Sequence, residues 1–486
     1  MASGLAPICL IENLPFELIS NIFWHGLPAS TMMSMSNEDD DHAHLIKYLV
    51  LITSISSHLR EIAVKSPYLW SIITWGLSEP PGLGPSDSTA VQERARITIF
   101  LMRSQDTLLE ISFLGLRSSS AQCEAAWRII TPHLHRCRRL ALIMASPSLP
   151  IHDLYRGTCF LDICMPFPSA MEPLEFLTII GGRLQAGNAF SIFSPGVAAS
   201  TTHLQKLCID VSHELFPLLK TMTSPKPPLL SEITLTDTLG NFDLFHFWEI
   251  LGSMSSSIRK LSISYAGWFK GQHFAHNAME FPLLEQLEVG ANWDFSFAEH
   301  FIAPALQRLS LTRYSRNIRR TDSTQYPIDP SSITHCNWPC LTSLSLEPIP
   351  THNIGWLHVV LFPLLRALPK LQELDSRARR TQARHVMNFL GRSSTPPTVP
   401  GEEDADTEEY HGAPLPALQR LVIRHDSAGF QDGPESVSLR SEDITRLLMA
   451  RPRLCANISI WSLEGREEAE KLTSIFGERF EPGELE

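Results

Sequence analysis

The chain has 486 residues, of which 43% are hydrophobic and 19% charged, and its formal net charge is −12 at pH 7. A chain of this length exceeds one compact core, so we expect several domains or an extended repeat array. The acidic balance argues against sequence-independent binding of nucleic acid, which needs a basic surface for the phosphates. Residues 1–10 lack the basic start and apolar run of a signal peptide, and the densest apolar stretch, residues 356–368, is too short to span a bilayer. We therefore expect a cytoplasmic or nuclear protein with no membrane partner and no nucleic-acid partner.

Residues 8–76 predict a small all-α segment of three helices. Pro15 suits a first helical turn, and apolar residues then recur at helical spacing as far as Phe23. Residues 37–41 are mostly acidic and are expected to form a loop. The three helices are expected over residues 14–23, about 45–54 and 57–64. Residues 77–92 include a run rich in proline, glycine and serine and are expected to link this segment to the rest of the chain.

Over residues 93–486 one short string keeps returning. In it, proline precedes Leu-x-x-[Leu/Ile], usually with another apolar residue two places on. Copies of this string begin at Pro228, Pro282, Pro304, Pro339 and Pro416, and a weaker copy at Pro369 has Ser376 in its last apolar position. Between Leu174 and Leu371 the first apolar positions lie 22 to 35 residues apart. A leucine-rich repeat has a period of about 20–29 residues.

This spacing predicts a strand followed by a helix in each repeat. The last two apolar residues of a string alternate on a short strand and so point into the core, and the proline ends the helix before it. The expected fold is an α/β solenoid, a degenerate leucine-rich-repeat array over residues 93–486 behind the three-helix segment. Residues 393–416 are expected to form a mobile insertion, because six acidic residues between Glu402 and Glu409 have no basic residue among them. The alternative is an α/β domain whose buried strands merely look alike.

The N-terminal segment resembles the F-box. The string Leu14-Pro15-x-Glu17-Leu18-x-x-x-Ile22-Phe23 resembles its opening, and residues 60–71 look like its close in the large fungal set of F-box proteins. With the repeats behind it, the chain resembles F-box/leucine-rich-repeat proteins. The resemblance implies that the segment docks a Skp-type adaptor, which joins the chain to a cullin in an SCF-type cullin–RING ubiquitin ligase, and that the repeats select a protein substrate. The residues that it assigns to adaptor contact are Leu14, Pro15, Leu18, Ile22, Phe23, Ile55 and Leu59.

This chain departs from the F-box pattern in three places. Leu59 stands where the family usually has tryptophan, Ser56 stands where it often has cysteine, and residues 31–44 are longer than usual. Two alternatives therefore remain: a leucine-rich-repeat scaffold that recruits no ligase, and an apolar stripe that is simply a core helix packed on the repeats.

A search for catalytic and metal-binding motifs gives little. The sequence has no G-x-S-x-G elbow, no Walker-type loop and no G-x-G-x-x-G. The two groups that resemble metal ligands are residues 133–137, with two histidines and Cys137, and residues 335–340, with one histidine and two cysteines. Neither has a second pair at zinc-finger spacing, so structural cysteines are favoured over metal ligands. We expect a non-catalytic protein without a cofactor.

The substrate surface is predicted from the repeat register. Residues that alternate with the core positions of each strand should line the concave face of a solenoid. The candidate substrate-binding residues are Lys206, Lys260, Arg308, Arg313, Arg377, Arg420 and Arg424. Arginines also cluster over residues 313–320 and 377–384, which makes an acidic or phosphorylated substrate segment one candidate ligand. The alternatives are a solvated surface, or pairing with the chain's own acidic residues 402–409.

Overall fold

The computed structural model of the protein divides into two compact units, residues 1–254 and residues 255–486, and each is described by itself. The described residues are 14–27, 38–76, 87–114, 120–143, 173–180, 202–210, 229–237, 251–265, 279–290, 301–312, 338–347, 357, 361–378, 380–391, 415–425, 440–459 and 466–483. Arg313 and nearly all of the expected acidic insertion, residues 393–414, lie outside them.

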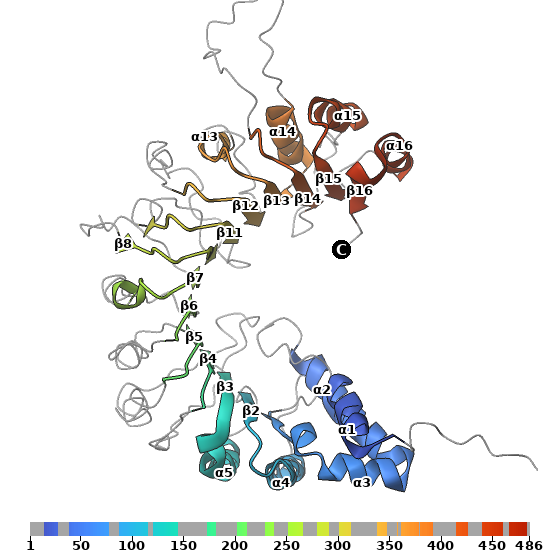
Figure 1. The fold of residues 1–486 in the computed structure, drawn as a ribbon, viewed down its shortest axis with the longest axis vertical. Coiled ribbons are helices and arrows are strands. Elements are labelled where there is room, and N and C mark those ends of the chain that lie inside the picture. The colour runs from blue at the N-terminus through green and yellow to red at the C-terminus, as the bar shows by residue number, and fades with distance from the viewer. Residues whose placement is uncertain are drawn as a thin grey trace, which may run out of the picture. The chain divides into compact units, whose positions relative to one another are not determined.

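The first unit begins with three helices, as the residue pattern predicts (Figure 1). They are α1 (Phe16–His25), α2 (Glu38–Ile55) and α3 (Ser57–Lys65), and the 3-10 helix η2 (Pro67–Trp70) follows. Both α1 and α2 pack on α3. Residues 38–41, expected in a loop, instead form the first turn of α2. Acidic residues favour a helix N-terminus because the helix dipole is positive there.

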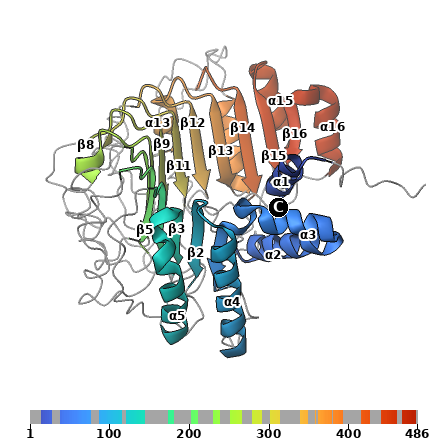
Figure 2. The same cartoon turned by 60° about the horizontal axis from the view of Figure 1, so that its bottom comes forward.

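Six parallel strands follow in the described part of the first unit, each paired with its neighbour in chain order. They are β1 (Ile72–Trp75), β2 (Leu109–Leu114), β3 (Cys137–Ile143), β4 (Phe176–Ile180), β5 (Lys206–Asp210) and β6 (Glu232–Asp237). The connecting helices α4 (Asp87–Arg103) and α5 (Ser120–Ile130) lie along one face of β2 and β3 (Figure 2), and η3 (Thr131–Arg136) leads into β3.

The sheet therefore starts earlier in the chain than the domain boundary expected at residues 77–92. Strand β1 lies within the segment expected to be all-α, and residues 87–92 of the expected linker belong to α4. All four residues of β1 are buried, and the run is too short to show the repeat spacing, which is why the sequence did not reveal it. Residues 77–86, the rest of the expected linker, lie outside the described residues.

Trp70 joins the three helices to the array. Its indole Nε1 donates to the carbonyl oxygen of Ala63 on α3 at 2.8 Å. Its ring meets Phe100 of α4 edge-on at 5.1 Å, and the guanidinium of Arg103 lies 4.4 Å from the ring centroid. The N-terminal helices and the first strand–helix pair therefore share one core, which restricts movement of one against the other.

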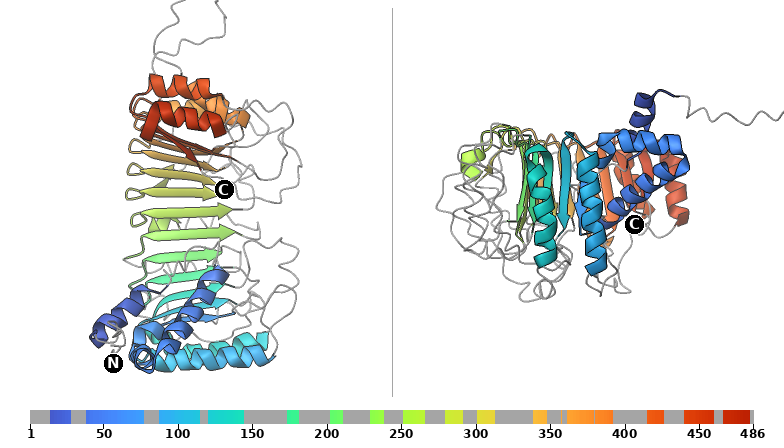
Figure 3. Two further views of the ribbon diagram at one scale, coloured as in Figure 1. Left: turned by 90° about the vertical axis from the view of Figure 1, so that its right-hand side faces the viewer. Right: turned by 90° about the horizontal axis from the view of Figure 1, so that it is seen from below.

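Among its described residues the second unit has eight parallel strands, which Figure 3 shows side by side. They are β7 (Lys260–Tyr265), β9 (Gln286–Gly290), β11 (Arg308–Thr312), β12 (Ser343–Glu347), β13 (Glu373–Ala378), β14 (Arg420–His425), β15 (Cys455–Ser459) and β16 (Phe480–Gly483). The later strands alternate with helices α13 (Phe362–Arg366), α14 (Arg380–Leu390), α15 (Ser441–Ala450) and α16 (Arg466–Phe476). The 3-10 helix η7 (Gly477–Arg479) precedes β16. The short strands β8 (Met279–Glu280) and β10 (Phe301–Ile302) pair with each other.

The apolar positions of the repeated string form ladders across these strands. Leu261, Leu287, Leu309, Leu344, Leu374 and Leu421 stand in register and are buried. In the next ladder Ser376 takes an apolar position between Leu346 and Ile423, is 1% exposed, and its hydroxyl has no hydrogen-bond partner among the described residues. Parallel strands alternating with helices confirm the expected α/β, solenoid-like class.

Buried Arg136 and half-buried Arg451 and Arg479 tie successive strand–helix pairs together by binding the carbonyl ends of helices. The guanidinium of Arg136 donates to the carbonyl oxygens of Leu101, Gln105 and Thr107, at and just beyond the end of α4. Arg451 does the same for Leu390 at the end of α14 and for Leu415. Arg479 donates to the carbonyls of Leu448 and Arg451 around the end of α15. A cation suits these positions because the last carbonyls of a helix lack partners and carry partial negative charge.

Candidate functional site

The exposed surface of the N-terminal helices is the first candidate site. Leu18 and Ile22, one turn apart on α1, are 50% and 52% exposed, and Ile55 at the end of α2 is 59% exposed. Pro15 is exposed and Leu14 half-buried. Five of the seven residues predicted to contact an adaptor are therefore accessible. Exposed aliphatic side chains on a small helical unit are candidates for contact with a partner protein.

Phe23 and Leu59, the other two predicted contact residues, are instead buried. Phe23 points inward together with Ile19, four residues before it, and Leu59 packs inward beside Ile62 and Ala63 on α3. The reason is the spacing: positions 18, 19, 22 and 23 are all apolar, but they belong to two adjacent helix faces, and only packing on α3 decides which face is buried. In this conformation these two side chains support the surface without forming part of it.

Several exposed apolar residues were missed by the sequence analysis. Leu51 is 58% exposed and lies one turn before Ile55 on α2, so the spacing of these two residues could have revealed it. Trp24 and Tyr68 are also exposed, and their rings meet edge-on at 6.1 Å between α1 and η2. Nothing in the local sequence predicts that pair, because it joins residues 44 positions apart.

Polar contacts hold α1 and α3 in place. The Tyr48 hydroxyl donates to the carbonyl oxygen of Phe23 at 3.0 Å, near the end of α1, and burial raises the pKa of this phenol. Gly26 lies so close that a Cβ there would be 2.3 Å from the Tyr48 hydroxyl. The Ser56 hydroxyl accepts the Leu59 backbone N–H at 3.2 Å and so caps α3. At the position where the F-box pattern often has cysteine, this chain therefore has a helix-capping residue.

The face of the first sheet opposite its core carries the second candidate site. One row of residues, paired from strand to strand between β2 and β6, consists of Glu110, Arg139, Phe176, Lys206 and Glu232. The guanidinium of Arg139 lies 4.3 Å from the centre of the Phe176 ring, and the Lys206 ammonium lies 5.6 Å from it. Each cation also has a carboxylate: Glu110 at 3.6 Å from Arg139, and Glu232 at 2.7 Å from Lys206. The row is thus internally paired, and Lys206 is engaged within it.

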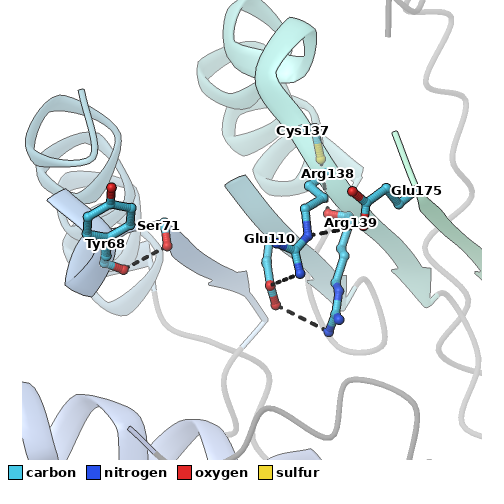
Figure 4. Close-up of polar contacts among 7 residues, drawn as sticks. All are labelled: Tyr68, Ser71, Glu110, Cys137, Arg138, Arg139 and Glu175. Atoms are coloured by element: carbon cyan, nitrogen blue, oxygen red, sulfur yellow. Dashed lines mark hydrogen bonds and ion pairs between the residues drawn. The ribbon is translucent and has the colours of Figure 1, made fainter. Parts of the chain in front are cut away.

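Figure 4 shows how the carboxylate of Glu110 lies between two arginines. Arg138 is 3.8 Å from Glu110 and 3.4 Å from Glu175, so this cation is shared by two acidic residues on strand β2 and next to β4. The charges of these two arginines are therefore neutralised by carboxylates of the first unit itself.

In the second unit the predicted substrate-binding residues fall into two groups. Arg420 lies 3.6 Å from Glu373, and Arg424 lies 2.9 Å from Asp375, in both cases across β13 and β14. Arg377 is half-buried and also engaged. In contrast, Lys260 and Arg308 are exposed and have no ion-pair or hydrogen-bond partner among the residues that the structure describes.

The two groups that resemble metal ligands are not assembled into a site in the described part of the chain. Cys137 is buried, its thiol donates to the Arg139 carbonyl at 3.0 Å, and burial raises its pKa, which disfavours the thiolate that a metal needs. Burial and the neighbouring Arg136 lower the pKa of His133. Cys340 is exposed, and residues 335–337 lie outside the described ranges. Among the described residues, no group of three His, Cys, Asp or Glu side chains could hold a metal ion.

Comparisons with models of protein families and with curated proteins gave no match. None of the described helices is both long and apolar enough to cross a membrane.

Proposed function

We propose that this protein is the substrate-recognition subunit of a cullin–RING ubiquitin ligase of the SCF type. Its N-terminal helices would dock a Skp-type adaptor, and the strand–helix array would bind a protein substrate. The observation that carries the proposal is the exposure of the aliphatic side chains of Leu18, Ile22 and Ile55, on a segment that resembles the F-box. The chain itself supplies recognition and no catalysis, and it works in the cytoplasm or nucleus.

Covering these exposed side chains would supply part of the free energy of docking. Burying a whole leucine or isoleucine side chain stabilises by about 1.5–3 kcal/mol, so a half-exposed one contributes about 1 kcal/mol when a partner covers it. Leu18, Ile22 and Ile55 together would supply about 3 kcal/mol, and Leu51 beside them adds to that sum. Because Trp70 joins the helices to the first strand–helix pair, a docked adaptor would be held in a fixed relation to that part of the first unit.

We also propose that the strand–helix units are degenerate leucine-rich repeats. The spacing of 22 to 35 residues between the first apolar positions and the buried ladders that those residues form support this. In stacked repeats, every second side chain of each strand points to the polar face of the sheet, and such a face suits a folded protein or a peptide as ligand.

Co-purification with a Skp-type adaptor tests the proposal. The wild-type chain should retain the adaptor, and a Pro15→Ala/Leu18→Asp variant should lose it, because a carboxylate on the docking face must be desolvated. Val91→Asp is the matched control, since Val91 is 54% exposed on α4, away from this face. Loss in the first variant and retention in the control would support docking, whereas no retention by the wild type would refute it.

A second candidate function is a repeat scaffold that recruits no ligase. The burial of Phe23 and Leu59 favours it, since it removes two of the seven expected adaptor contacts. In that case the N-terminal helices only cap the first strands of the array. The co-purification separates the two, because a scaffold would bind no adaptor while keeping its stability.

A further inference from the structure

In the second unit, two cations on one polar face of the sheet have no partner among the described residues. Lys260 on β7 and Arg308 on β11 occupy the same register row, with Gln286 of the intervening strand β9 between them. Apart from Glu288 on β9, the nearby positions on the same face are small hydroxyl residues or glycine: Ser262, Ser310, Ser343, Ser345, Thr312 and Gly290. Both cations are exposed and lack a partner among the described residues. Small neighbours leave their charges accessible to a ligand that lies across the strands.

The other predicted cations of this kind are already neutralised. Lys206 is 2.7 Å from Glu232, Arg420 is 3.6 Å from Glu373, and Arg424 is 2.9 Å from Asp375. A ligand carboxylate would have to displace a resident one at each of these positions. At Lys260 and Arg308 it would displace no carboxylate of the described residues.

We infer that strands β7, β9 and β11 bind an extended acidic peptide segment whose carboxylates are three residues apart. Neighbouring strands lie about 4.8 Å apart, so Lys260 and Arg308, two strands apart, are separated by about 10 Å at the backbone. In a polyproline II segment every third side chain lies on the same face, about 9 Å further along. Such a segment crossing the strands brings one carboxylate to each cation. This inference rests on the proposed function in one respect: it treats the acidic segment as part of a substrate of the ligase.

The negative charge of Glu288, near the two cations, favours a peptide whose acidic residues are spaced apart over one whose acidic residues are consecutive. Glu288 lies on β9, two residues beyond Gln286, on the same face. It is thus diagonal to both Lys260 and Arg308, and a ligand carboxylate over β9 would meet like charge there. Phosphate fits less well than carboxylate, because a dianion is usually held by several converging donors, and here each cation stands alone.

Fluorescence anisotropy with labelled peptides tests the inference on the full-length chain. The probe has four Glu-Pro-Pro triplets, which favour polyproline II. Its controls are the Gln-Pro-Pro peptide, a peptide with four consecutive glutamates and a phosphoserine-Pro-Pro peptide. The Glu-Pro-Pro probe should bind, its affinity should fall as salt rises from about 50 to 300 mM because exposed charges are screened, and the Gln peptide should not bind.

Matched variants then locate the site. Lys260→Gln and Arg308→Gln should each weaken binding about twofold to fivefold, and the Lys260→Glu/Arg308→Glu variant should abolish it, in line with exposed ion pairs. Arg420→Gln and Lys206→Gln should leave binding unchanged, since their side chains already have partners. Glu288→Gln should improve binding of the continuous glutamate peptide more than of the spaced one. Unchanged far-ultraviolet circular dichroism and thermal midpoints would establish that each variant is folded.

Equal binding of the Gln peptide, or equal weakening by the Arg420 and Lys206 controls, would overturn the inference. Phosphoserine binding more than about tenfold tighter than glutamate would overturn the choice of carboxylates, because one extra charge at an exposed pair does not supply that much. The peptide assay contains no adaptor. If the chain binds the adaptor but not the Glu-Pro-Pro peptide, this inference alone is rejected. If it binds the peptide but not the adaptor, the proposed ligase role alone is rejected.

Discussion

Replacing Arg136 tests whether buried arginines join successive strand–helix pairs. Arg136→Met keeps the length of the side chain but removes its hydrogen bonds to the carbonyls of Leu101, Gln105 and Thr107. Each buried carbonyl left without a hydrogen bond lowers the free energy of unfolding by about 1–3 kcal/mol. Removing the buried charge of Arg136 recovers part of that loss. We expect a net loss of about 3 kcal/mol. For a unit of this size, the melting temperature should fall by about 6–12 °C.

Arg128→Met is the matched control for this prediction. Arg128 is on neighbouring α5, its side chain is 68% exposed, and its ion pair with Glu124 lies on the surface. Exposed pairs contribute about 0–1 kcal/mol, so its melting temperature should change by no more than about 3 °C. Both variants are measured by differential scanning calorimetry and urea unfolding, following the first transition because repeat arrays do not always unfold in one step. Equal effects of the two substitutions, or no effect of Arg136→Met, would refute the capping role.

Three further predictions concern other positions. Ser376→Ala should stabilise the second unit by about 1 kcal/mol in urea unfolding, because it removes a buried hydroxyl with no partner among the described residues, and a loss of stability would contradict this. Gly26→Ala should destabilise the N-terminal helices, since its Cβ would be 2.3 Å from the Tyr48 hydroxyl, and Tyr48→Ala should relieve that clash in a double-mutant cycle of thermal midpoints. The pKa of His133 is lowered by burial and by Arg136, so the unfolded state binds its proton more readily. The stability that neutral His133 contributes is therefore present above about pH 6.5 and is lost as the pH falls through the lower pKa of the folded state. The His133→Gln substitution should flatten the pH dependence of the melting temperature in this pH range.

The fold was predictable from the sequence where a repeat imposed a spacing, and less so elsewhere. Strands such as Gln286–Gly290 and Arg308–Thr312 coincide with copies of the Leu-x-x-Leu string, because that string places two residues on one side of a strand. Strand β1 was not predictable, since four consecutive buried residues give no period. The start of α2 was also misjudged, because charged residues at 38–41 resemble a loop as readily as a helix end.

The candidate sites were predictable as regions but not as contacts. The apolar stripe of α1 was evident, yet its division into inward Ile19 and Phe23 and outward Leu18 and Ile22 depends on packing against α3. The same holds for the cations of the array. Arg420 and Glu373 are 47 positions apart, and only the register of β13 and β14 shows that they meet.

The central claim, that the outward face of α1 and α2 docks an adaptor, is tested most directly by calorimetric titration with a purified Skp-type adaptor. Each of Leu18→Ala, Ile22→Ala and Ile55→Ala removes about 1 kcal/mol of burial at the interface and should raise the dissociation constant about fivefold. Val91→Ala, a similar truncation at an exposed valine of α4, should leave it unchanged. No measurable binding by the wild-type chain, or an equal loss with Val91→Ala, would contradict the account.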